Sequence, residues 1–148
     1  MKSIYLIGSL KNENVPIIGI DLRKLGYEVF DDWYSPGPEA DDFWRKYEKQ
    51  KGITYDKALK GYAAKHIFEF DKFHLDRCDI AILIMPAGKS CHLELGYMIG
   101  KGKRCFVLFD QEPERWDVMY IFAEAVFTNL RDLTEYLFKI TKNENKNL

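Results

Sequence analysis

The run of apolar residues at positions 80–85 (IAILIM) restricts the possible folds of this chain more than any other stretch. An apolar run without polar alternation predicts a strand buried on both faces, as in a parallel sheet covered by helices. Pro86 and Gly88 end this strand, and the polar pair at 89–90 leads into an amphipathic helix that ends near residue 100. A strand, a tight loop and a helix N-terminus form the corner at which α/β proteins bind anions.

Shorter apolar runs at residues 2–7, 27–30, 105–109 and 125–127 predict four further strands. Helical patterns separate the strands, and this alternation is typical of a parallel sheet with helices on both faces. The sequence therefore predicts a single doubly wound α/β domain, flavodoxin-like or Rossmann-like, with a five-stranded parallel sheet. The other expected helices span residues 14–25, 38–51, 54–77, 115–124 and 129–140.

The segment 34–65 is expected to be a helical insertion after the second strand, because it is longer than an ordinary crossover. With this insertion, residues 1–141 are expected to form the domain, and the polar residues 142–148 a flexible tail. Acidic and aromatic residues in the insertion either form a lid or simply pack: Asp41, Asp42, Trp44 and Tyr47.

The composition excludes several classes of protein. The chain has 148 residues, 47% of them apolar, which suits one domain with a buried core and argues against disorder. Its formal net charge of -1 and scattered basic residues argue against a nucleic-acid or membrane partner. Three cysteines without CxxC spacing are expected to be reduced thiols, so a cytoplasmic location is expected.

Two sequences near residue 90 resemble known motifs but lack residues that those motifs require. The Gly-Lys-Ser sequence beginning at Gly88 would be a P-loop only with a glycine five positions earlier, where Leu83 stands. The His92-x-Glu94 spacing resembles that of zinc deaminases, but the P-C-x-x-C that they require is absent. Cys91 and His92 are neighbours that point apart on a helix, so no nucleophilic pair is expected. The sequence thus predicts neither a metal nor a cofactor.

Three loops are expected at the carboxyl ends of the strands, at residues 8–11, 31–34 and 86–94. Ligands of open α/β sheets bind at this edge, near the point where the strand order reverses. The first and third loops both contain glycine, serine and lysine. Backbone amides, a hydroxyl and an ammonium group suit a phosphate or a sugar hydroxyl.

Two acids near these loops are candidates for chemistry. Glu94 either stabilises the start of its helix through the dipole, by at most about 1 kcal/mol, or is a nucleophile that the dipole keeps ionised. Asp71 shares one helix face with Leu75 and Cys78, where a carboxylate is costly unless it has a partner or a function. The nearby aromatic residues are expected to belong to the core: Phe68, Phe70 and Phe73.

Together these residues resemble the nucleoside 2-deoxyribosyltransferase family, which includes the 2′-deoxynucleoside 5′-monophosphate N-glycosidases. The sequence IYLIGSL at residues 4–10 is similar to the Y-F-x-G-S opening of the family. Asp71, Asp79 and the Glu-Leu-Gly sequence at 94–96 follow its central pattern, and residues 116–120 (WDVMY) resemble its C-terminal methionine segment. The resemblance covers most of the chain apart from the insertion.

The resemblance implies cleavage or transfer of the N-glycosidic bond of a 2′-deoxynucleoside or its 5′-monophosphate. Glu94 would attack C1′ to form a covalent glycosyl-enzyme, as in retaining glycosidases. Asp71 would bind the sugar or assist the leaving base, Tyr5 would orient Glu94 or the sugar, and Trp33 and Tyr34 would stack on the base. The implied substrate-binding residues are Gly8, Ser9, Lys11, Asp32, Trp33, Gly88, Lys89, Ser90 and Met119.

The resemblance also implies a small-molecule partner and a homo-oligomer, because family sites borrow a methionine from a neighbouring subunit. The transferases carry an acid six positions before the nucleophile, where this chain has Gly88, and this loop is nearer to that of the monophosphate hydrolases. Two other readings stay open: a nucleotide-binding or sensor module of the same fold without turnover, and a hydrolase of another nucleotide such as NAD.

Overall fold

The computed structural model describes residues 1–148, and its centre is a five-stranded sheet in the order β2-β1-β3-β4-β5. Every pair of neighbouring strands in the sheet is parallel. This order is that of flavodoxin-like folds, so the predicted fold class is confirmed. The strands are Ser3–Ile7 (β1), Glu28–Phe30 (β2), Ile80–Ile84 (β3), Arg104–Leu108 (β4) and Ala125–Phe127 (β5).

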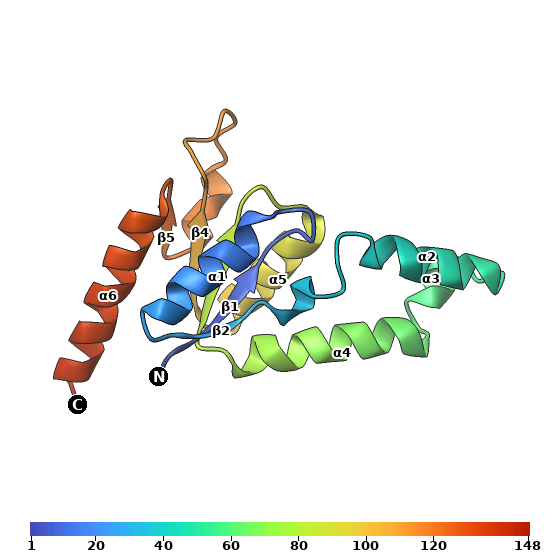
Figure 1. The fold of residues 1–148 in the computed structure, drawn as a ribbon, viewed down its shortest axis with the longest axis horizontal. Coiled ribbons are helices and arrows are strands. Elements are labelled where there is room, and N and C mark those ends of the chain that lie inside the picture. Colours follow the sequence, from blue (N-terminus) through green and yellow to red (C-terminus); the bar gives the residue numbers. More distant parts are fainter.

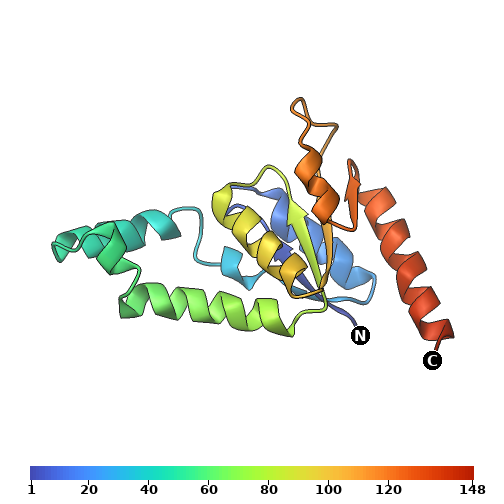
Figure 2. The ribbon, with the colours of Figure 1, turned by 180° about the vertical axis from the view of Figure 1, so that it is seen from behind.

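Helices cover both faces of the sheet, α1 and α6 on one and α4 and α5 on the other (Figures 1 and 2). No helix is both long enough and apolar enough to span a lipid bilayer. The α-helices are Asn14–Lys24 (α1), Ala40–Gln50 (α2), Tyr55–Ala58 (α3), Tyr62–Arg77 (α4), Lys89–Gly100 (α5) and Leu130–Lys146 (α6). Two short 3₁₀ helices are Asp32–Tyr34 (η1) and Val118–Phe122 (η2).

The central strand β3 is buried along its whole length, which explains its uninterrupted apolar sequence. Because side chains alternate across a strand, Ile82 packs with α1 and α6 while Leu83 packs with α4 and α5. The start of β3 is tied to β1, since the Asp79 carboxylate accepts hydrogen bonds from the Ser3 amide (3.1 Å) and hydroxyl (3.0 Å). Asp79 therefore aligns two strands and lies away from the expected ligand edge.

Three helices differ from the sequence-based expectation. The one expected over 115–124 is only the short 3₁₀ helix η2, and two others differ at their boundaries. The helix expected over 54–77 is two helices, because Gly61 adopts an extended backbone conformation between α3 and α4. The last helix continues to Lys146 instead of ending near residue 140. Glu144 in this extension pairs with Lys2 (3.2 Å) and Arg104 (3.0 Å), which gives the polar end of the chain contacts with the sheet.

The segment between β2 and α4 extends away from the sheet as an arm, defined here as residues 35–61 (Figure 1). Helix α4 connects the arm to β3 and packs on the sheet with only one face. Leu75 and Cys78 are buried there, as the helical spacing predicts. The expectation that three phenylalanines of α4 are core residues is wrong, because they lie on its other faces and are 48–64% exposed: Phe68, Phe70 and Phe73.

An ion pair between the exposed Arg23 and the buried Asp31 joins α1 to the end of β2. Arg23 donates to both carboxylate oxygens of Asp31, at 2.6 and 3.1 Å, and also to the Val29 carbonyl at 2.9 Å. The pair fits only because residue 19 is glycine: a Cβ atom there would lie 2.2 Å from an Asp31 oxygen. Gly19 is therefore required by packing, although glycine is a poor helix former.

We expect Gly19→Ala to lower the free energy of unfolding by about 1–3 kcal/mol, because it displaces a buried carboxylate from its partner. The matched control is Gly96→Ala in α5, where a Cβ atom would meet no atom within 4 Å. That substitution should stabilise the protein by about 0.5–1 kcal/mol through helix propensity. Urea denaturation measures both changes, and a stabilised Gly19→Ala variant would contradict the packing argument.

Candidate active site

A cavity of about 650 Å³ opens at the carboxyl ends of β1 and β3. The strand order reverses between these strands, so α1 and α5 leave toward opposite faces and their loops separate. The structure brings nine of the twelve predicted site residues together in the lining of this cavity. They are Gly8, Ser9, Lys11, Asp32, Trp33, Asp71, Gly88, Ser90 and Glu94.

The carboxyls of Glu94 and Asp71 face the cavity from α5 and α4. Burial and the negative charge of Asp71 raise the pKa of Glu94 to about 7, although an interaction with the Tyr5 hydroxyl opposes this shift. Burial and the charge of Asp41 raise the pKa of Asp71 to about 6. Two carboxyls with raised pKa values in one cleft hold a proton near neutral pH, which is typical of acid–base sites.

Tyr5 lies beneath the cavity, in the middle of β1, and is 1% exposed. Burial first, and then the charges of Glu94 and Asp71, raise the pKa of the Tyr5 hydroxyl above its usual range. The hydroxyl therefore stays protonated and can donate a hydrogen bond to the Glu94 carboxylate. Its ring is held by Phe30 of β2, with centroids 5.1 Å apart.

Trp33 forms an aromatic wall of the cavity in a fixed orientation. Its indole nitrogen donates to the Leu6 carbonyl oxygen at 2.7 Å. Gly8, next to the ring, is required by the close approach of α1, since a Cβ atom there would lie only 2.7 Å from Val15, whereas its distance of 3.5 Å from Trp33 would be an ordinary contact. Tyr34 packs against the core between the sheet and α1 and does not line the cavity, so the structure does not support its expected stacking role.

Two residues predicted for the substrate site lie outside the cavity. Lys89 is exposed at the first position of α5 and does not line it. Met119 lines a separate, largely apolar cavity of about 420 Å³ between α5 and η2 and is 59% exposed. Within one chain, therefore, the side chains of Lys89 and Met119 do not line the cavity that contains the carboxyls of Glu94 and Asp71.

Cys91 and His92 have separate environments, in agreement with the prediction that they form no nucleophilic pair. Cys91 lines the cavity, but burial and the charge of Glu94 raise the pKa of its thiol, which disfavours the reactive thiolate. His92 bridges two segments instead: its ring nitrogens contact the Gly88 carbonyl oxygen at 2.7 Å and the Tyr120 hydroxyl at 2.9 Å. This bridge ties the loop before α5 to η2.

The arm and α4 contribute cavity residues that the sequence did not reveal as a group, among them Asp41, His66 and Phe70. Of the four insertion residues considered for a lid, only Asp41 reaches the cavity. Trp44 packs edge-on against Tyr55, with ring centroids 6.5 Å apart. In the sequence, Asp41 stands out only as an acid at the start of a predicted helix. The direction in which the arm folds depends on contacts between distant residues, so the sequence alone did not place Asp41 in the cavity.

The cavity has few cations and no arrangement suited to a metal. Lys11 is the only lysine or arginine in its lining. No group of three or more His, Cys, Asp or Glu side chains lies close enough to hold a metal ion. The N-terminus of α5 has no side-chain cap, so backbone N–H groups of its first turn remain available beside the cavity. Backbone amides and hydroxyls are thus the main donors for a polar ligand.

Solved structures with a similar fold include two enzymes. A 2-deoxyribosyltransferase from Bacillus psychrosaccharolyticus has a TM-score of 0.60 and 21% identity, over 88% of this chain and 89% of that chain. A CMP N-glycosidase from Clostridium botulinum has a TM-score of 0.54 and 16% identity, over 95% and 99%. No family model and no curated protein matches the chain. The chain therefore has the fold of the enzymes that its motifs resemble.

The raised pKa of Glu94 makes a prediction about stability. The folded state retains the Glu94 proton from pH 4.5, the ordinary value, up to about pH 7, so wild-type stability should fall as pH rises through this window. Glu94→Gln removes the titration. We expect its melting temperature to exceed that of wild type at pH 8 and to approach it near pH 4.5. A difference that does not change with pH would contradict the raised pKa.

Proposed function

We propose that this protein cleaves the N-glycosidic bond of a 2′-deoxynucleoside or its 5′-monophosphate, with Glu94 as the nucleophile. The observation that carries the proposal is the placement of Glu94 and Asp71 in one cavity at the point where the strand order reverses. Two enzymes that share the fold are named for deoxyribosyl transfer and for N-glycosidic cleavage. The same chemistry at the same edge of the sheet is therefore the simplest interpretation of this site.

The reaction proceeds in two displacements at C1′. In the first, a Glu94 carboxylate oxygen forms a bond to C1′ while the N-glycosidic bond breaks and its electron pair moves to the base. Asp71 donates a proton to the departing base. In the second, water loses a proton to Asp71 and attacks C1′, which releases Glu94 and a free sugar. A second base in place of water would give transfer instead of hydrolysis.

The productive form has an ionised Glu94 and a protonated Asp71. Because the pKa of Glu94, about 7, is higher than that of Asp71, about 6, the proton lies mostly on Glu94 in the free protein, and the productive form is the less populated of the two singly protonated states. Because such neighbours share a proton, their apparent pKa values belong to the pair. The Tyr5 hydroxyl stabilises the ionised form of Glu94, which favours the productive arrangement. The active form should therefore be most populated near neutral pH.

The lining also suggests how a nucleotide would lie. Trp33 and Phe70 offer aromatic surfaces for the base, with Asp32 beside them as a hydrogen-bond acceptor. The sugar would then lie over Glu94. Its 5′ end would point to the rim that carries Ser9 and Lys11.

We also propose that the protein is a homo-oligomer with an interface on the face formed by η2 and α5. This face exposes several large apolar side chains, more than is usual for a surface in contact with water. They are Leu93, Trp116, Val118, Met119, Ile121 and Phe122, which are 59–84% exposed. The Met119 of one subunit would then be available to a neighbouring subunit.

A panel of nucleosides and 5′-monophosphates tests the function, with release of free base as the measurement. We expect Glu94→Ala to lower kcat by about 10⁴-fold or more, because the nucleophile is lost. The matched control is Glu69→Ala, an exposed glutamate on α4 outside the cavity, which should retain activity. Equal base release by Glu94→Ala and wild type would rule out Glu94. A ligand that raises the melting temperature without turnover would favour a binding module.

The charge of Asp41 makes a separate prediction about pH dependence. Because this charge raises the pKa of Asp71, Asp41→Asn should let Asp71 lose its proton at lower pH. Because the pKa of Asp71 is the lower of the two, the acid limb of the kcat/KM profile should then move to lower pH and the maximum of the profile should fall, while the alkaline limb stays near the pKa of Glu94. Asp42→Asn is the matched control, since Asp42 pairs with Arg45 at 3.3 Å and does not line the cavity. Equal shifts in both variants would contradict a specific role for Asp41.

A further inference from the structure

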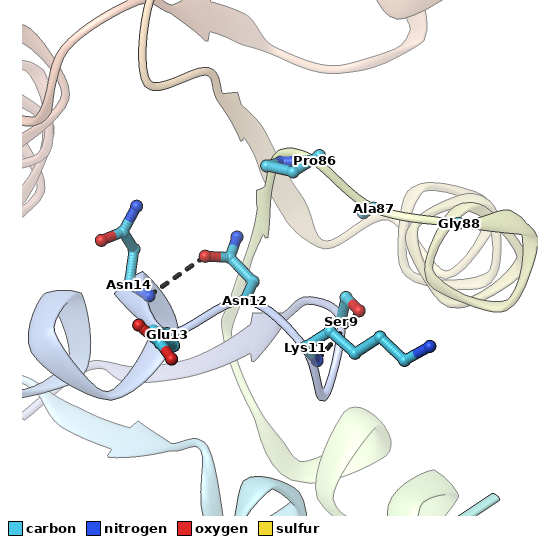
Figure 3. Close-up of a pocket in the computed structure, with 8 residues that line it drawn as sticks. All are labelled: Ser9, Lys11, Asn12, Glu13, Asn14, Pro86, Ala87 and Gly88. Carbon is cyan, nitrogen blue, oxygen red and sulfur yellow. Dashed lines mark hydrogen bonds between the residues drawn. The ribbon is translucent and has the colours of Figure 1, made fainter. Parts of the chain in front are cut away.

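Helix α2 of the arm exposes apolar and charged side chains that lack partners within the chain. The polar cavity of about 500 Å³ that adjoins the active site is different, because its buried polar side chain is already partnered (Figure 3). The Asn12 side chain there accepts a hydrogen bond from the Asn14 amide at 3.0 Å and donates one to the Met85 carbonyl oxygen at 3.5 Å. The surface of α2 is therefore the better candidate for a further binding surface.

The side chains of α2 form three rows along the helix, because residues three and four positions apart lie on the same face. The inner row faces the cavity and the rest of the arm: Asp41 lines the cavity, Trp44 packs on Tyr55, and Glu48 is buried. The other two rows are called the aromatic row and the charged row here. The aromatic row contains Phe43, Tyr47 and Gln50, and the charged row contains Glu39, Asp42, Lys46 and Lys49.

The aromatic row is exposed on a segment that has little buried surface. Phe43 is 60% exposed and Tyr47, one turn later, is 53% exposed. Within the arm, only Glu48 and Ala58 are buried. Contact of the aromatic row with another apolar surface would therefore stabilise the arm by removing large side chains from water.

The charged row is divided by sign along the helix. Glu39 and Asp42 lie at the N-terminal end of α2, and Lys46 and Lys49 follow toward its C-terminal end. Asp42 forms an exposed ion pair with Arg45 at 3.3 Å, and the other three charges of the row form no ion pair within the chain. A row with one acidic end and one basic end is complementary to a copy of itself that runs in the opposite direction.

We propose that α2 is the docking surface for a second copy of this chain, with the two α2 helices antiparallel about a two-fold axis. Phe43 of each copy then contacts Tyr47 of the other, and the acidic end of each charged row lies beside the basic end of its partner. The aromatic pair is centred on residue 45 and the charged row on residue 44, so a single axis satisfies both. Self-complementary contacts of this kind are typical of two-fold dimers, and charges beside an apolar seam set the orientation of paired helices.

This interface is distinct from the face formed by η2 and α5. The arm extends from one end of the molecule, and η2 (orange) lies toward the end that carries α6 (Figures 1 and 2). The two interfaces can therefore form independently. The inference does not rest on the proposed function either, because neither the aromatic pair nor the charged row lines the cavity.

Sedimentation velocity of the full chain, over about 1–200 μM, tests the proposal, since a single pair of short helices should associate with micromolar affinity. Lys46→Glu with Lys49→Glu makes both ends of the charged row acidic, and Glu39→Lys with Asp42→Lys makes both ends basic. Each double variant alone should associate through α2 at least about tenfold more weakly than wild type, because like charges then face each other. An equimolar mixture of the two should recover the association, because opposite charges then meet at both ends.

The mixture also guards against misfolding, since two variants that had lost α2 would not recover association when mixed. Phe43→Ser removes an exposed ring without changing the charge and should weaken the dimer as well. The matched control is Lys139→Glu with Lys142→Glu on α6, which changes the net charge equally and should leave the association unchanged.

Three results would overturn the proposal. The first is a wild type that is monomeric at every concentration, which would leave the aromatic row to a different protein. The second is an assembly whose mass is unchanged in both double variants, which would place its contacts on another face, such as that of η2. The third is a mixture of the double variants that associates no better than either one alone.

Discussion

The parallel pairing of β1 with β3 is the contact on which the rest of the structure depends. Both strands are buried on both faces, and the Asp79 carboxylate holds their first residues in register through Ser3. The chain leaves β1 toward one face and β3 toward the other. The two loops must therefore separate, and the space between them becomes the cavity.

The same burial determines the electrostatics of the site. Tyr5 belongs to the core of the sheet and also lies beneath Glu94, so the fold and the site share a residue. The carboxyls of Glu94 and Asp71 are close enough, and sufficiently shielded from water, for each to be protonated well above its ordinary pKa. A cavity assembled from exposed loops alone would not produce such shifts. Proximity to the sheet makes these two acids chemically different from the others.

The arm adds a wall to a cavity that the sheet alone would leave open. It brings Asp41 toward Asp71, and it has a small core of its own. Trp44 packs on Tyr55 there, and Glu48 is 4% exposed and pairs with Lys51 at 3.1 Å. The arm therefore affects the proton affinity of Asp71, because it brings the negative charge of Asp41 toward this carboxyl.

The sequence alone determined the class of fold, the strand carrying the site, and the acids Glu94 and Asp71, because apolar periodicity and motif spacing are local properties of the chain. It did not determine the exposure of the phenylalanines on α4, the approach of Asp41 to Asp71, or the separation of Lys89 and Met119 from the cavity. Those features depend on how far α4 and the arm extend beyond the sheet and on which loops meet at its edge. Contacts between segments distant in sequence decide both, and only the tertiary structure contains them.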